Sequence, residues 1–177
     1  MTISCRVSPC SRKDIRKYSR HFREQLNLGN ALEFPIVEVL EGFSEAGYFD
    51  IEIVPVDAMP NSYGETLYHQ KLIRIREDIY DKACEGDGFS RSTIAHELFH
   101  FFKHRNEEIV FCRTVEELES RKTYEDPEWQ ANCFAGELLV PIKLVKEMSI
   151  EEVVEKCRVS HQMATYQLNK YEIDGWV

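Results

Sequence analysis

The stretch at residues 93–104, TIAHELFHFFKH, constrains the fold of this chain more than any other. Its apolar residues recur at helical spacing, as Ile94, Leu98, Phe101 and Phe102. Ser90 or Ser92 can cap a helix that begins just before them. His96 and His100 are four residues apart, so they project from the same side of that helix. The sequence therefore predicts a buried helix that holds two imidazoles side by side.

Glu97 comes directly after the first of these histidines, which gives the string HExxH. Two neutral imidazoles can bind one Zn²⁺ without cancelling its whole charge, and the adjacent carboxylate is a competent general base near neutral pH. A chance match on a packed helix is the alternative interpretation. A polar stripe on so apolar a helix needs a reason, however, and a third ligand can be found.

Five residues are candidates for that third ligand: His104, Glu107, Asp126, Glu128 and Glu137. His104 continues the histidine row, but it lies about two turns from His96, too far to close on the same tetrahedral metal. Asn106 occupies the position at which the extended motif carries its third histidine, so that class of peptidase is excluded.

The stretch at residues 125–141, EDPEWQANCFAGELLVP, predicts a second helix. Its limits are marked by Asp126, Pro127 and Pro141. On this helix Glu128 shares a stripe with Ala131, Asn132 and Ala135, and small residues there let the helix approach its neighbour closely. Glu137 faces the opposite side. Glu128 is therefore the preferred ligand, against the alternative of an exposed first-turn glutamate favoured by the helix dipole.

In the rest of the chain, the spacing of apolar residues changes from helical to alternating and then back to helical. Helical spacing predicts helices at residues 11–26 and 34–43, and alternation predicts strands within residues 48–56, 65–70 and 71–78. In the first strand Phe49, Ile51 and Ile53 are expected on the buried face. The chain is helical again from Ile79, and residues 105–126 predict a loop with one short element.

Helices around a small meander give an α+β class, mostly helical with a three-stranded sheet. A chain of 177 residues has room for one domain. We expect a single domain over residues 1–177, with an N-terminal helical segment (1–47), a catalytic core (48–145) and a C-terminal helical element (146–177).

Composition narrows the expected partners and location. With 31 acidic and 22 basic residues the net charge is −9, which disfavours direct binding to nucleic acid. The basic run from Arg12 to Arg23 is interpreted as a solvated helix face. No apolar stretch approaches the ~20 residues of a membrane span, and the N-terminus lacks the apolar region of a signal peptide. A cytoplasmic protein with six reduced cysteines is expected.

Together, STIAHELFHFFKH and PEWQANCFAGELLVP resemble the paired motifs of the ImmA/IrrE family of metallopeptidases, in which an HExxH helix precedes a helix reading ExxANxFAxxLLxP. The approach to the first motif, IRIREDIYDKACEGDGFSRSTIAHE, is also similar. CRVSHQMATYQL resembles the family's closing element, which is like a helix-turn-helix. The resemblance covers roughly residues 48–170.

This resemblance implies one zinc per chain, held by His96, His100 and Glu128, with Glu97 as the catalytic base. It implies a gluzincin-like fold whose small sheet flanks the HExxH helix. It also implies an endopeptidase of bacteria or their mobile elements that cleaves a helix-turn-helix repressor and so derepresses its genes. The acidic charge suits approach to a basic DNA-binding protein.

Two positions depart from the family pattern. Phe99 stands where glycine is frequent and is expected to narrow or restructure the substrate cleft, and Gln130 stands where a second acidic residue is common. An extended substrate is expected along a sheet edge within Tyr63 to Ile75. Three residues are candidates to donate a hydrogen bond to the oxyanion of the tetrahedral intermediate, without a choice among them: Tyr68, His69 and His161.

The sequence leaves other interpretations of single residues and of the whole chain open. His104 is expected to support the metal site indirectly or to cap its helix, and the C-terminal helices to pack on the core rather than read DNA. The chain could instead be a non-catalytic or toxin–antitoxin-type partner that sequesters a regulator through the same fold. Hydrolysis of a non-peptide amide is a third hypothesis.

Overall fold

The computed structural model of the protein describes residues 5–105, 110–111 and 122–175. The helices are α1 (Arg12–Gln25), α2 (Ile36–Glu45), α3 (Glu77–Cys84), α4 (Gly88–Phe99), α6 (Pro127–Leu139), α7 (Ile142–Val145), α8 (Ile150–Cys157) and α9 (His161–Ile173). The strands are β1 (Cys5–Arg6), β2 (Asp50–Val54), β3 (Gly64–Leu67), β4 (Leu72–Arg76) and β5 (Val110–Phe111). The class is α+β, as predicted. None of the helices described is long and apolar enough to cross a bilayer.

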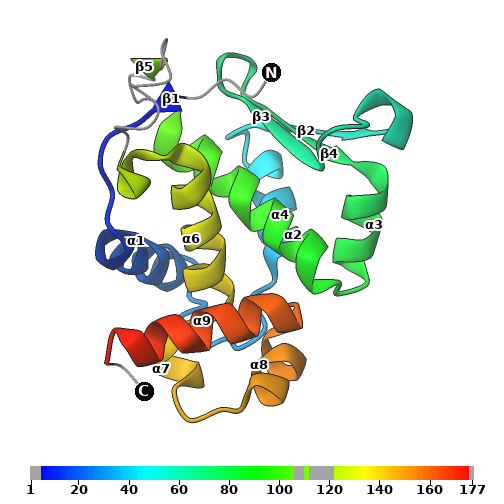
Figure 1. The fold of residues 1–177 in the computed structure, drawn as a ribbon. Coiled ribbons are helices and arrows are strands. Elements are labelled where there is room, and N and C mark those ends of the chain that lie inside the picture. The colour runs from blue at the N-terminus through cyan, green and yellow to red at the C-terminus, as the bar shows by residue number, and fades with distance from the viewer. Residues whose placement is uncertain (1–4, 106–109, 112–121, 176–177) are drawn as a thin grey trace.

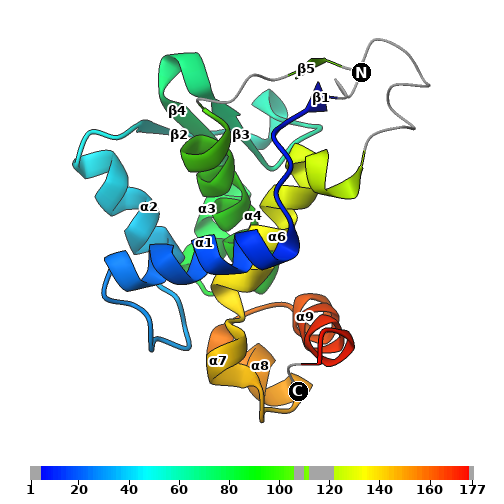
Figure 2. The ribbon, with the colours of Figure 1, turned by 90° about the vertical axis from the view of Figure 1, so that its left-hand side faces the viewer.

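The centre of the fold is the packed pair α4 and α6, which α1 crosses on one side (Figures 1 and 2). Phe99 of α4 stacks on Phe134 of α6 with ring centroids 4.8 Å apart, and Tyr18 of α1 contacts both rings. Phe99 is only 1% exposed. The ring of Phe99 therefore fills the space between these helices, so the expectation that it narrows the substrate cleft is wrong.

The three-stranded sheet has the order β2–β4–β3, with β4 parallel to β2 and antiparallel to β3. Ile73 and Ile75 of the central strand are fully buried, whereas Ile53 beside Ile75 is 41% exposed. The expected burial of Ile53 is wrong because β2 is an edge strand. The predicted strand at residues 65–70 ends at Leu67 and continues as a 3₁₀ turn, Tyr68–Gln70.

Side-chain caps fix the ends of the central helices. Ser11 caps α1 and Asp126 caps α6, with Pro127 in the first turn, as predicted. The cap of α4 is Asp87 rather than Ser90 or Ser92, since its carboxylate accepts from the backbone N–H of Ser90 at 2.8 Å. The helix thus begins earlier than the serines suggest.

Three of the four arginines of α1 point inward, which corrects part of the expectation from sequence, whereas Arg20 and the two lysines of the basic run are exposed, as expected. Arg12 and Arg16 each bind the buried carboxylate of Glu137 at 2.9 Å. Arg23 is 2% exposed and donates to the backbone oxygen of Leu138. These guanidinium groups point inward because α1 crosses the C-terminal half of α6.

The C-terminal helices α8 and α9 close the lower end of the molecule in Figure 1. Tyr171 of α9 donates to Glu137 at 3.0 Å, and it also lies 2.6 Å from the backbone oxygen of Val140. Gly136 lets α9 come close, because a Cβ there would stand 2.8 Å from the side chain of Gln167. The expected packing of this element against the core is confirmed.

Part of the loop predicted at residues 105–126 lies outside the described residues, and so do Asn106, Glu107 and Cys112. The described part contains β5, which pairs with β1, and a 3₁₀ turn at Thr123–Glu125. Among the cysteines whose side chains the structure describes, Cys10, Cys84, Cys133 and Cys157 form no disulfide bond.

Candidate metal centre and active site

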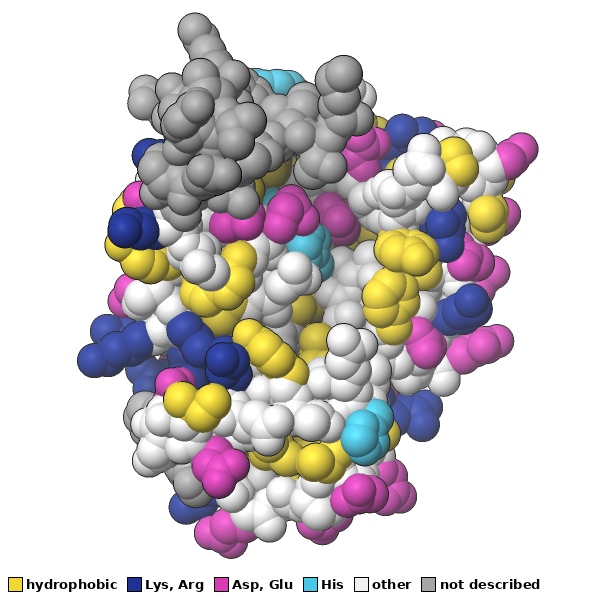
Figure 3. All heavy atoms as spheres, in the orientation of Figure 1, with side chains coloured by type: hydrophobic (Ala, Val, Ile, Leu, Met, Phe, Trp, Pro, Cys, Tyr) yellow, Lys and Arg dark blue, Asp and Glu magenta, His cyan; other side chains and the backbone are white. Residues whose placement is uncertain are grey.

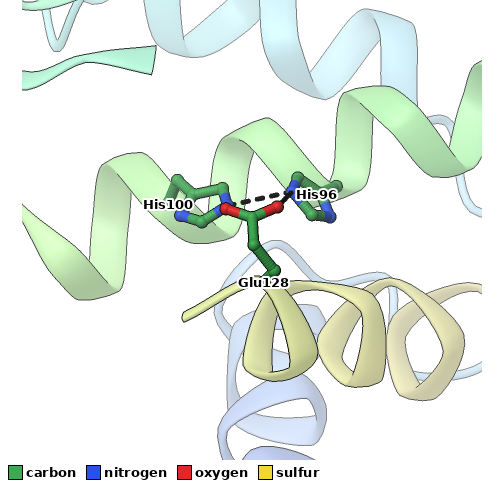
Figure 4. A group of neighbouring side chains, drawn as sticks. All are labelled: His96, His100 and Glu128. Carbon is green, nitrogen blue, oxygen red and sulfur yellow. Dashed lines mark hydrogen bonds and ion pairs between the residues drawn. The ribbon is translucent and has the colours of Figure 1, made fainter. Parts of the chain in front are cut away.

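The structure brings His96, His100 and Glu128 together, where α4 faces the first turn of α6 (Figure 4). The Nε2 atoms of the two histidines are 2.9 Å apart. The Glu128 carboxylate lies across both, with one oxygen 3.2 Å from His96 Nε2 and the other 3.3 Å from His100 Nε2. Three ligand atoms thus converge on one point.

Packing of small residues accounts for this convergence. Ala95 of α4 and Ala131 and Ala135 of α6 are essentially buried, so the two helices approach closely along this face. The Asp126 cap and Pro127 fix the start of α6. Glu128, which follows them, is thereby held over the histidines.

A hydrogen bond from α6 sets the orientation of His96. Its Nδ1 lies 3.0 Å from the side-chain oxygen of Asn132. An amide oxygen only accepts, so Nδ1 carries the proton and donates to it. The lone pair of His96 is therefore on Nε2, the atom that faces Glu128.

A longer chain of hydrogen bonds, from Gln130 through His104, sets the orientation of His100, and we call it the relay. The Gln130 amide nitrogen donates to the backbone oxygens of Ser8 at 2.9 Å and Tyr124 at 2.8 Å, so its oxygen faces His104 Nε2 at 3.0 Å. His104 therefore carries its proton on Nε2, and its Nδ1 accepts from His100 Nδ1 at 3.1 Å. The lone pair of His100 is left on Nε2, toward the cluster.

This relay explains two features of the sequence. A carboxylate at position 130 could not donate to two backbone oxygens, so an amide suits the site. His104 is 1% exposed and orients His100 from behind, which agrees with the expectation that it supports the cluster indirectly. A π-helical turn at His100–His104, which extends α4, places the two rings in contact.

Charge in the cluster is concentrated on the carboxylate. When the two imidazoles carry a proton on Nε2 as well, hydrogen bonds from His100 and His96 hold the pKa of Glu128 well below its usual range. Burial by itself lowers the pKa of His96, but hydrogen bonding to Glu128 and the charge of Glu97 outweigh burial and raise it. An anionic carboxylate beside two imidazoles is a site that attracts a cation.

The donor set fits a catalytic zinc ion. Two imidazole nitrogens with outward lone pairs and one carboxylate provide three protein ligands, which leaves a fourth position open. Glu128 is exposed, so the open side of the cluster faces solvent. Figure 3 shows this face, with histidine and acidic side chains at the upper end of a hollow.

Glu97 points from α4 toward β3 and is only 6% exposed. The Thr66 hydroxyl lies 2.7 Å from one of its carboxylate oxygens and 3.1 Å from its backbone oxygen. Gly64 of the same strand gives the carboxylate room. Glu97 is thus held between the histidine helix and the nearest strand of the sheet.

The family model of the IrrE N-terminal-like domain, Peptidase_M78, matches residues 46–169. The chain belongs to this family. The match extends from the segment before β2 into α9, and it includes both helices of the cluster. No curated protein and no solved structure matches the chain.

In this M78 domain, the candidate oxyanion donors and the remaining candidate ligands lie apart from the cluster or at its margin. Tyr68 lies nearest, with its hydroxyl 3.5 Å from His100 Nδ1, whereas His69 is exposed and His161 contacts Thr165 within α9. Glu137 faces away from the cluster, as predicted. Asp126 caps α6 instead of joining the ligands.

Four residues of the site have roles that the sequence does not predict: Gly64, Thr66, Gln130 and Asn132. Asn132 lies on the predicted stripe of α6, one turn after Glu128, and that spacing is a signal for contact with His96. Gly64 is the last residue of the turn-forming stretch PNSYG at residues 60–64, and Thr66 follows it, but the sequence does not reveal which strand contacts Glu97. Gln130 depends on backbone atoms of Ser8 and Tyr124, which no local pattern indicates.

Replacement of Gly64 by alanine is expected to lower peptidase activity about 100-fold while metal content is unchanged. The new Cβ would stand 2.9 Å from Cγ and 3.1 Å from Oε1 of Glu97, so the carboxylate must move. Displacement of a reacting group by about 1 Å can cost roughly 10²-fold. Steady-state hydrolysis of a peptide and elemental analysis measure the two effects.

Gly42→Ala in α2 is the matched control, because a Cβ at Gly42 meets nothing within 4 Å. Wild-type activity in Gly64→Ala would contradict the assigned position of Glu97.

Proposed function

We propose that this chain is a zinc-dependent endopeptidase that cleaves a helix-turn-helix transcriptional repressor and so derepresses its genes. The observation that carries the proposal is the cluster of His96, His100 and Glu128 with the Glu97 carboxylate beside it. Membership of a metallopeptidase family supports it.

His96, His100 and Glu128 would hold the metal, and their Nε2 and carboxylate atoms are already oriented for it. When bound, zinc supplies a Lewis acid that polarises the substrate carbonyl and makes water acidic near neutral pH. Glu97 then accepts the proton of the attacking water and returns it to the leaving amine. Thr66 holds the Glu97 side chain in place for both transfers.

We propose that the substrate peptide binds along the edge strand β3. Among the described residues it pairs with β4 on one side only, so its other edge can accept an extended peptide. Thr66 and Gly64 of this strand both adjoin Glu97, so a peptide paired with β3 would pass beside the general base. This edge lies within Tyr63 to Ile75, the segment that the sequence favours.

A repressor substrate is supported by the charge of the chain and by the family resemblance. The net charge of −9 favours association with a basic DNA-binding protein. Incubation with a helix-turn-helix regulator encoded near the gene, followed by mass spectrometry of the products, tests this part. Cleavage at one bond is expected, and an intact regulator beside an enzyme that cuts other peptides would contradict it.

Removal of the metal is expected to abolish peptide hydrolysis reversibly. Dialysis against a chelator should reduce the rate to background, and one equivalent of Zn²⁺ per chain should restore it, because three side chains form one site. A peptide mixture analysed by mass spectrometry provides the measurement. Hydrolysis that is unaffected by the chelator would contradict the metallopeptidase mechanism.

A further inference from the structure

A basic groove lies between α1, the loop after it, and the junction of α6 with α7, with a cavity of about 920 Å³. Its cationic side chains are Lys13, Arg16, Lys17, Arg20 and Arg23 of α1, with Lys143 and Lys146 beyond α6. Figure 3 shows Lys and Arg side chains gathered at the left of the face, at the level of α1 in Figure 1. We call this feature the basic groove.

The charge of the basic groove opposes that of the chain. Seven cationic side chains face two carboxylates, Glu24 and Glu137, in a protein whose net charge is −9. Both oxygens of Glu137 are engaged by Arg12 and Arg16. The pair Arg20–Glu24 is 3.7 Å long and half exposed, so the two side chains are only weakly held together.

Three lysines of the basic groove form no close ion pair, and the carboxylate of Asp14 acts on Lys13 and Lys17 only from beyond ion-pair distance. Among the residues that the structure describes, Lys13, Lys17 and Lys143 form no ion pair with any carboxylate. All three are exposed and line the same cavity. Their combined field attracts an anion to the groove.

The buried side of the groove carries unmet hydrogen-bonding capacity. Ser19 and Arg23 are 1% and 2% exposed, and in the described part of the chain Ser19 Oγ and Arg23 Nε have no hydrogen-bond partner. The other nitrogens of Arg23 donate to the backbone oxygens of Leu138 and Ala31. Desolvation lowers the pKa of Arg23 to about 10, since no carboxylate offsets its burial.

We propose that the basic groove binds a small organic phosphate such as a mononucleotide, with the phosphate on the Ser19–Arg23 side. A phosphate ester supplies the anionic oxygens that a buried hydroxyl and a guanidinium lack. Pro141, Ile142 and Leu144 form an apolar wall for the organic part. The cavity has the size of a small-molecule site, and Ser19 and Arg23 at its inner side are almost fully buried, which favours a small ligand over a nucleic-acid duplex.

The test is calorimetric titration of the full zinc-loaded chain with adenosine monophosphate at low salt, with inorganic phosphate titrated separately. Saturable one-site binding is expected, tighter for the nucleotide than for phosphate. Ser19→Ala and the pair Lys17→Ala/Lys143→Ala are each expected to weaken it about tenfold or more, because they remove hydrogen bonds or charges to an anion.

Matched controls separate a local site from the charge of the whole protein. Lys82→Ala/Lys156→Ala removes the same charge from exposed positions on α3 and α8, outside the groove, and should leave binding unchanged. Ser19→Ala should keep the unfolding temperature, because the lost hydroxyl has no partner in the described structure. A folded Ser19→Ala variant with weaker binding thus supports contact at this side of the groove.

Several outcomes overturn the proposal. They are no saturable binding of either probe, an equal loss in the control pair, or unchanged affinity in Ser19→Ala. Binding of a single-stranded oligonucleotide without binding of the mononucleotide also overturns it, and would assign the groove to nucleic acid. None of these variants alters the histidine–glutamate cluster, so a failure here leaves the proposed peptidase function intact.

Discussion

Glu97→Gln is expected to reduce peptide hydrolysis by about 10²- to 10⁴-fold, the usual contribution of a general base, with metal content unchanged. Glutamine has nearly the same shape as glutamate, but its amide cannot accept the proton of the attacking water. Thr66 can still donate to the amide oxygen, so the side chain should keep its place. Single-turnover rates on a peptide substrate, together with zinc content, measure the effect.

Glu155→Gln provides the matched control, since this glutamate is exposed on α8 and belongs to no part of the cluster.

The Glu97→Gln variant also separates the two functional hypotheses, a peptidase and a non-catalytic partner that sequesters a regulator. In cells that carry the repressor and a reporter, a peptidase should lose derepression with Glu97→Gln, whereas a sequestering partner should retain it. Full derepression by the inactive variant would favour sequestration.

Glu128→Ala is expected to lower the affinity for zinc by more than about 100-fold. The zinc content after purification should then fall from about one zinc per wild-type chain to nearly none in the variant. Loss of a residue that merely orients a ligand typically costs 10- to 100-fold, and Glu128 is the only carboxylate among the three converging side chains. Both of its oxygens face the histidines. Elemental analysis after purification without added metal, and competition with a chromogenic chelator, measure the loss.

The fold should tolerate this change, because Glu128 is exposed and its removal leaves no buried cavity. Unfolding temperatures recorded without metal should therefore agree for wild type and variant. Glu155→Ala serves as the control for loss of an exposed glutamate from a helix. A Glu128→Ala chain that still holds a full equivalent of zinc would contradict the assigned ligand set.

The sequence predicted the α4–α6 pair and the place of Glu128 well, because helical period, caps and small residues are local signals. Burial that depends on distant segments was harder to predict. Phe99 fills a gap between α4 and α6, and Arg23 finds its acceptor on Leu138, 115 positions away. Neither neighbour is visible in the residues beside them.

The same limit applies within the site. The histidines and Glu97 follow from one motif, but the strand that supports Glu97 is known only from the register of the sheet. The Asp87 cap was missed because three polar residues near the start of α4, Asp87, Ser90 and Ser92, are all good caps. Only the backbone geometry distinguishes them.

The relay behind His100 makes metal binding and the docking of the N-terminal segment reciprocal. Gln130 joins the backbone of Ser8 to His104, and His104 orients the ring that faces Glu128. A coupling free energy between two events acts equally in both directions. If the cluster binds an ion, docking of Ser8 would therefore raise the affinity for that ion, and the bound ion would stabilise the contact between Ser8 and α6 by the same amount.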